Sequence, residues 1–239
     1  MVSPSRSAKT AAIFYFISWV GSIAGLIFYG PVFKNSNYLT GGASDSHIVI
    51  GALLEMVCAF AIIGTGVALF PIVRRYSESL ALGYAALRTF EASVIAVGVL
   101  PILAIISLRT QAGTSGVNDL ATSMVDFHNL SFIVGPNLIC GVNTTVMAYA
   151  LYKSRLVARF VPTLGLIGGP LVFFSGVLKM FDGGQLDSTA TALMAIPVFA
   201  WEISLASHLF FKGFRASALA KLNVKVSEDV VEDRVLAAV

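Results

Sequence analysis

Charged residues are scarce in this chain of 239 residues, in which Asp, Glu, Lys and Arg together make up 12%. Soluble domains contain roughly 25% of these residues, so the composition excludes a globular core with a fully hydrated surface. Hydrophobic residues make up 56%, and the mean hydropathy is +0.83. Most of the chain is therefore expected to contact membrane lipids, and no nucleic-acid partner is expected.

Cysteine and the common chemical motifs are also rare or missing. Cys58 and Cys140 both fall in apolar segments, which predicts small packing residues rather than a disulfide or a thiolate metal site. The sequence has no HExxH, P-loop, GxGxxG or GxSxG pattern. We therefore expect no metal and no cofactor, and no catalytic residue can be named. His47 and His128 are predicted to form hydrogen bonds near one membrane face.

Long apolar segments are what the chain does contain. Each is about 20 residues or longer, which is enough to cross the hydrocarbon core of a bilayer. We expect helices at about 10–33, 47–73, 79–108, 126–152, 160–181 and 190–211. The predicted fold class is therefore an all-α membrane protein with a single bundle of six transmembrane helices. Residues 1–9 form a short N-terminus, 109–125 a polar loop and 212–239 a polar tail.

The basic residues predict the orientation of these helices, because cytoplasmic connections carry an excess of Lys and Arg. Three of them lie on the side of the 34–46, 109–125 and 182–189 loops: Lys34, Arg109 and Lys179. Ten lie on the other side: Arg6, Lys9, Arg74, Arg75, Lys153, Arg155, Arg159, Lys212, Arg215 and Lys221. Both termini are therefore predicted to be cytoplasmic.

Four charged residues interrupt the apolar segments. Charges inside a span are costly, so they usually face the protein interior and often mark a function. At a rise of about 1.5 Å per residue, Arg88 lies about 13 Å from one face, Glu91 about 18 Å and Glu202 about 15 Å. Glu55 lies about 12 Å from the opposite face. Together they predict a polar site near the middle of the membrane.

The spacing predicts how these charges meet. Arg88 and Glu91 share a helix face at i, i+3 and can form an ion pair. Arg88 has five donors, so Glu55 or Glu202 is expected to supply a second carboxylate from a neighbouring helix. Removal of Glu91 alone is then expected to strand a buried charge and to cost about 3–5 kcal/mol. The candidate binding residues are Glu55, Arg88, Glu91, Asn137, Trp201 and Glu202.

Aromatic residues give a weaker indication. Trp201 is adjacent to Glu202 and can line a cavity or simply pack against neighbouring helices. Tyrosines near the predicted helix ends suggest an aromatic belt at the membrane interfaces, and these are Tyr15, Tyr29, Tyr38, Tyr76 and Tyr152.

Several motifs in this order resemble one family. They are GALLE at 51–55, ALFPIVRRYSESLALGY at 68–84, RxxE at 88–91, FHNLSFIVGPNL at 127–138, LVARFVPTLGLIGGPL at 156–171, WE at 201–202 and FKGFR at 211–215. Together they resemble the DUF4386 family of small bacterial and archaeal membrane proteins, over about 45–215. The resemblance implies six transmembrane helices and a prokaryotic plasma membrane. It implies no substrate, because the family is one of unknown function.

Three functions remain open from the sequence. The first is binding or transport of a small solute, ion or proton, which predicts a cavity lined by Glu55, Arg88, Glu91 and Glu202. The second is an intramembrane enzyme acting on a lipid-type substrate, which predicts a nucleophile or metal beside a carboxylate. The third is a structural or regulatory role, which predicts a packed interior with an ion pair and no cavity.

Overall fold

The regular elements of the chain are all helical within the residues that the computed structural model describes, which are 3–33, 39, 44–181 and 189–223. In chain order they are α1 (Pro4–Phe33), α2 (Asp45–Val73), α3 (Glu78–Arg109), α4 (Val117–Phe132), the π-helix η1 (Ile133–Ile139), α5 (Cys140–Ser154), α6 (Phe160–Phe181) and α7 (Thr189–Phe211). Because α4, η1 and α5 follow one another without a break, they form one span. The described chain thus has six helices long and apolar enough to cross a membrane, as the composition predicted.

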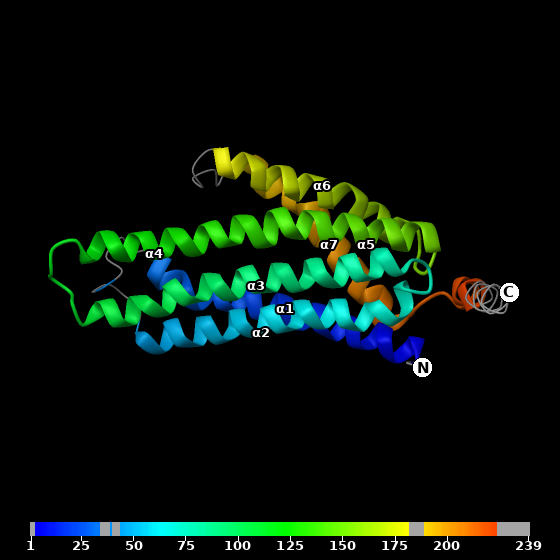
Figure 1. The fold of residues 1–239 in the computed structure, drawn as a ribbon, viewed down its shortest axis with the longest axis horizontal. Coiled ribbons are helices and arrows are strands. Elements are labelled where there is room, and N and C mark those ends of the chain that lie inside the picture. Colours follow the sequence, from blue (N-terminus) through cyan, green and yellow to red (C-terminus); the bar gives the residue numbers. More distant parts are fainter. Residues whose placement is uncertain (1–2, 34–38, 40–43, 182–188, 224–239) are drawn as a thin grey trace, which may run out of the picture.

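The six spans run roughly along one axis (Figure 1), and the contacts between them form a closed ring. Each span contacts the next along the chain, and α7 returns to contact α1. With six crossings, both ends of the described chain lie at the same end of the bundle. This end is called the terminal end below, and the opposite one the loop end. The ring closes around an interior to which every span can contribute a side chain.

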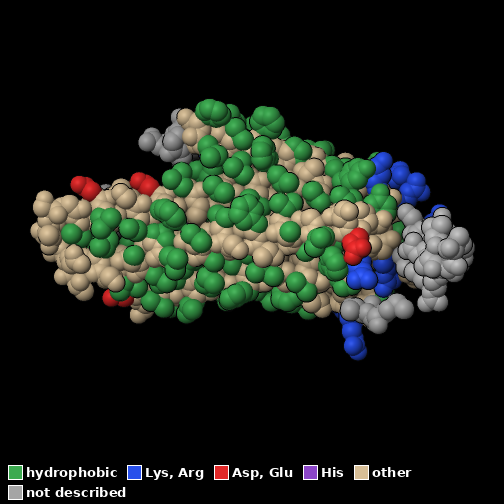
Figure 2. Space-filling view, in the orientation of Figure 1, with side chains coloured by type: hydrophobic (Ala, Val, Ile, Leu, Met, Phe, Trp, Pro, Cys, Tyr) green, Lys and Arg blue, Asp and Glu red, His purple; other side chains and the backbone are tan. Residues whose placement is uncertain are grey.

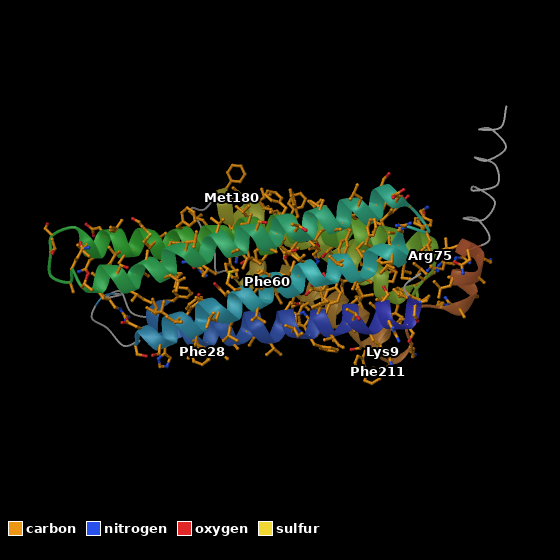
Figure 3. All side chains as sticks on the ribbon, turned by 60° about the horizontal axis from the view of Figure 1, so that its bottom comes forward. Lys9, Phe28, Phe60, Arg75, Met180 and Phe211 are labelled. Carbon is orange, nitrogen blue, oxygen red and sulfur yellow. The ribbon has the colours of Figure 1, made fainter. Side chains whose placement is uncertain are left out.

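Apolar side chains are spread over the middle of the bundle on the face seen in Figure 2. Large hydrophobic residues there are well exposed, among them Phe60, Val67 and Leu100. Lys and Arg side chains gather instead at the terminal end, where Lys9 and Arg75 are labelled in Figure 3. An apolar belt with charge beyond one end is the surface that a membrane-spanning bundle needs.

The interior is apolar towards both ends, and buried charged residues lie in between, beside a smaller apolar cluster of α2 and α3. A cluster that includes Leu69, Leu151 and Leu205 fills the terminal end. A second cluster, which includes Ile102 and Val125, fills the loop end. Residues Glu55, Arg88 and Glu91 are buried between these clusters. The polar site is therefore enclosed by packed hydrophobic residues along the axis of the bundle.

Close helix contacts depend on small residues, as between α6 and α7. A Cβ atom added to Gly168 would lie 2.4 Å from the backbone nitrogen of Val198 and 2.7 Å from the carbonyl carbon of Pro197. Backbone atoms cannot move aside as a flexible side chain can, so only glycine permits this approach.

The fourth span begins earlier than predicted. The sequence predicted a polar loop at 109–125 and a helix from about Asp126, whereas α4 begins at Val117, after Gly116 with φ +81°. The reason is a pattern that the polar composition concealed. Val117, Ala121 and Val125 repeat every four residues and are all buried in the loop-end cluster. One apolar stripe is enough to hold a helix whose other faces are polar.

The remaining predicted segments are described only in part. The 34–46 and 182–189 loops lie largely outside the described residues, as do Tyr38 and the tail from 224 onward. Within the predicted tail, residues 216–223 are helical, and Phe214 and Leu222 are buried against the terminal-end cluster. At the N-terminus, α1 already begins at Pro4, so Arg6 lies within the helix.

Candidate functional site

Arg88 is the centre of the buried polar site. Its side chain is 3% exposed, and its Nη1 donates to Glu91 Oε2 at 3.0 Å, which confirms the predicted i, i+3 ion pair. Its Nη2 donates to Glu202 Oε1 of α7 at 3.2 Å, and its Nε donates to Tyr84 Oη at 2.9 Å. The expected second carboxylate is therefore Glu202. The three nitrogen atoms of one guanidinium thus bind three side chains from α3 and α7.

Two tyrosines complete the surroundings of this guanidinium. The hydroxyls of Tyr15 and Tyr84 share a hydrogen bond of 2.8 Å. The guanidinium carbon of Arg88 lies 5.3 Å from the ring centroid of Tyr15 and 5.5 Å from that of Tyr84, within the range of cation–π attraction. The prediction that Tyr15 and Tyr29 belong to an interfacial belt is wrong, since both are fully buried. Their positions near helix ends did not reveal which face of α1 points inwards.

Each carboxylate also accepts a hydrogen bond from another span. Asn143 Nδ2 of α5 donates to Glu91 Oε2 at 2.6 Å, and Trp19 Nε1 of α1 donates to Glu202 Oε2 at 3.0 Å. Glu91 is 4% exposed at its side chain, whereas Glu202 is 17% exposed. The Arg88 cluster, by which we mean Tyr15, Trp19, Tyr84, Arg88, Glu91, Asn143 and Glu202, thus links four of the six spans.

Glu55 belongs to a different contact. Its Oε1 and Oε2 atoms lie 3.0 and 3.2 Å from His128 Nε2, and both side chains are buried. His128 was predicted to be an interfacial residue, and the structure corrects this. The helix that carries it begins earlier than expected, so His128 lies within the bundle. The rings of Tyr29, Phe33 and Phe132 lie 4.8–5.5 Å from the His128 ring, centroid to centroid.

Two cavities adjoin these groups. The Arg88 cavity, of about 350 Å³, is lined by Glu55, Arg88, Glu91 and Glu202, together with Trp19, Cys58, Phe199 and other residues. The His128 cavity, of about 600 Å³, is lined by Glu55, Asp126, His128, Asn129 and others. The two have Ser22, Glu55, Phe132, Asn137 and Lys179 in common. They are therefore neighbouring spaces that meet at Glu55.

Asn137 lies on η1, the wide helical turn between α4 and α5. Pro136 has no N–H group and cannot complete the normal α-helical hydrogen-bond ladder, and π-helical turns often occur at functional sites. Asn137 lines both cavities, and its Nδ2 lies 3.5 Å from the hydroxyl oxygen of Ser175 on α6. The distortion thus turns a polar side chain towards the cavities.

Trp201 lies outside this site. It is 1% exposed and packs in the terminal-end cluster, where a Cβ atom added to Gly165 would lie 2.7 Å from its ring. Of the two roles the sequence left open, the structure places Trp201 in helix packing. The adjacent Glu202 points to Arg88, because neighbouring positions on a helix face in different directions.

Several residues of the site were not singled out from the sequence. Tyr84 precedes Arg88 by four positions and therefore shares its helix face, and Asn143 is a polar residue in an apolar span, so the sequence contains a detectable signal for both. Trp19 gave no such signal, because indole is common at the membrane interfaces. Pairing Trp19 with Glu202, 183 positions apart, requires the tertiary structure.

Metal binding has no support in the described part of the chain, where no three His, Cys, Asp or Glu residues gather closely enough to hold an ion. Cys58 and Cys140 are free and buried, as predicted.

The fold and site define a multi-pass membrane protein with a buried arginine–carboxylate cluster beside a cavity lined by both charged and apolar side chains. The sequence profile of the family described as "Domain of unknown function (DUF4386)" matches residues 10–213, and the chain belongs to this family. Comparison with curated proteins and with solved structures finds no match.

Proposed function

We propose that the protein binds a small organic cation in the Arg88 cavity, within the membrane, as part of a binding or transport function. The observation that carries the proposal is Glu202. It joins Arg88 and Trp19, it lines the cavity, and it is the most exposed charged side chain of the cluster. A ligand can therefore reach a carboxylate that is already held in place by two donors. A volume of about 350 Å³ suits a small molecule.

The balance of charge favours a cation over an anion. Three carboxylates, Glu55, Glu91 and Glu202, line the Arg88 cavity, against the two cationic side chains of Arg88 and Lys179. With all five ionised and His128 neutral, the formal charge is −1, and Asp126 adds another negative charge in the adjoining cavity. In a low dielectric, one unbalanced charge favours a partner of opposite sign. A proton could supply that charge when no other cation is bound.

The aromatic lining favours an organic cation over a bare metal ion. Trp19 and Phe199 lie with ring centroids 6.0 Å apart, and both line the cavity. Aromatic faces attract alkylammonium and guanidinium groups, and a carboxylate beside them completes the recognition of such groups. Hard metal ions instead require several oxygen ligands at close range.

The alternatives fit the geometry less well. A purely structural role predicts a packed interior without a cavity. An enzyme acting on a lipid-type substrate needs an activated nucleophile. Two of the three serines that line the cavity, Ser18 and Ser175, instead direct their hydroxyls at the backbone carbonyls of Tyr15 and Thr191. The arrangement favours binding over catalysis.

The proposal includes a location and an orientation. The asymmetry of basic residues, together with the family, supports a prokaryotic plasma membrane, with lipids as partners and both termini in the cytoplasm. The site would then lie near the middle of the bilayer.

Thermal unfolding of the detergent-purified protein tests the proposal. Tetramethylammonium and guanidinium salts at low concentration are compared with sodium acetate at equal ionic strength. A ligand that binds only the folded state raises the unfolding temperature and saturates. We expect this for at least one of the two cations and a weaker effect in Glu202→Gln. The matched control is Glu78→Gln, because Glu78 is an exposed carboxylate at the start of α3. Equal responses of Glu202→Gln and the wild type, or no response to either cation, would overturn the proposal.

A further inference from the structure

The Glu55–His128 contact lies where the two cavities meet, apart from the Arg88 cluster. Glu55 is part of the wall of both cavities, and His128 is part of the wall of the His128 cavity alone. Both side chains are 4% exposed, and the nearest nitrogen–oxygen distance is 3.0 Å. A group on the Arg88 side and a group on the loop-end side can thus reach the same carboxylate through different cavities.

The hydrogen bonding of His128 is incomplete. Nε2 faces the carboxylate of Glu55, while Nδ1 is buried and has no partner among the described residues. An imidazole ring always carries a donor or an acceptor at Nδ1. A buried polar atom without a partner is uncommon in folded proteins and calls for an explanation such as a bound water or a functional role. The two nitrogens of His128 therefore have a carboxylate on one side and an unused hydrogen-bonding position on the other.

We infer that Glu55 and His128 form a proton-binding site that exchanges a proton between the two cavities. In the forward step, the lone pair of Nδ1 takes a proton from a hydronium ion in the His128 cavity, which leaves a neutral water there. The Nε2–H bond breaks with its electron pair left on nitrogen, and an O–H bond forms on Glu55. The carboxylic acid then releases the proton to water in the Arg88 cavity, and the same steps in reverse return a proton to the His128 cavity and restore the starting tautomer. Imidazole and carboxylate are the usual carriers of such protons within membranes.

Charged and titratable groups from the surrounding helices influence this site. They are Tyr29 of α1, Cys58 of α2, Arg88 and Glu91 of α3, Asp126 of α4, Lys179 of α6 and Glu202 of α7. Arg88 is already bound by Glu91 and Glu202, so Glu55 is the carboxylate of the Arg88 cavity that has His128 as its partner. The inference rests on this geometry and not on cation binding at Glu202, so the two proposals can fail separately.

Infrared difference spectroscopy of the full-length protein in lipid vesicles tests the inference. Acidification should produce the carbonyl band of a protonated carboxylic acid in the wild type. Glu55→Gln should lose that band, whereas Glu202→Gln, altered at the other carboxylate site, should keep it. A band of equal size in the wild type and in Glu55→Gln would overturn the inference, as would its loss only in Glu202→Gln.

A second variant tests the role of the imidazole and does not require Glu55→Gln to fold. His128→Gln keeps an N–H donor for Glu55 but cannot take up a proton, so the carboxylic band should remain and its midpoint should move by about one pH unit or more. In wild-type protein with ¹⁵N-labelled histidine, the His128 ring signals, identified by their loss in His128→Gln, should change over the same pH range as the band. An unchanged midpoint in His128→Gln, or His128 signals that do not respond over that range, would contradict the exchange of a proton between the two groups.

Discussion

Neutralisation of one carboxylate beside Arg88 should lower the free energy of unfolding far less than neutralisation of both. Arg88 binds Glu91 at 3.0 Å and Glu202 at 3.2 Å, so either partner alone still leaves the guanidinium paired. In Glu91→Gln the amide oxygen can still accept from Asn143, and repulsion between the two carboxylates disappears. We therefore expect a cost of about 1–2 kcal/mol, close to that of one weakened charge-assisted hydrogen bond.

Glu91→Gln combined with Glu202→Gln leaves an uncompensated positive charge buried between the apolar ends of the bundle. The expected cost is about 3–5 kcal/mol, as for other buried pairs that lose their counter-charge. Arg88→Met in that background removes the stranded charge and should recover much of the lost stability, since apolar replacement of a whole buried ionic group is often tolerated.

Reversible unfolding of the purified protein in mixed micelles measures these differences in free energy. The order of stability should be wild type, each single variant, the triple variant and, lowest, the double carboxylate variant. Glu91→Gln as unstable as the double variant would show that Glu202 does not share the charge. A triple variant no more stable than the double variant would show that the buried charge is not the source of the loss.

Three further predictions concern packing, hydrogen bonding and topology. Gly168→Ala should lower the free energy of unfolding by about 1–3 kcal/mol, because the added Cβ would meet the backbone of α7. The control Gly83→Ala has open space for its Cβ and should not lower it. Equal effects of the two substitutions would contradict the close packing of α6 on α7. Asn143→Leu removes the amide that donates to the ion pair and should cost about 1–3 kcal/mol in the same assay, and no loss would count against that contact. In intact cells, an impermeant thiol reagent should label Ser115→Cys but not Ser154→Cys, and the reverse pattern would refute the predicted orientation.

The sequence could predict the membrane fold because spanning helices need long apolar segments, and these are local features. Buried charge could be located for the same reason, since Arg88 and Glu91 interrupt an apolar segment three positions apart along one face. The structure changes the expected cost of removing Glu91, because Glu202 was only one of two candidates for the second carboxylate. Whether Glu202 or Glu55 pairs with Arg88 depends on how α2 and α7 pack around α3.

The partners of Glu55 and Glu202 could not be predicted in the same way. The sequence predicted a loop at 117–125 because this segment has more polar residues than the apolar stripe has members. His128 was therefore expected near a membrane face. Its contact with Glu55 became visible only when α4 was seen to start at Val117. Cavities are a still less local property, since their walls combine side chains from several spans whose relative rotation the apolar pattern does not specify.

A high-resolution experimental structure of the protein, soaked with whichever of tetramethylammonium and guanidinium raises its unfolding temperature, tests the central claim most directly. The account predicts density for the cation in the Arg88 cavity, against the aromatic face of Trp19 and within reach of the carboxylate of Glu202. A cavity closed by side chains, or one filled by a lipid acyl chain with Glu202 turned away from it, would contradict the account.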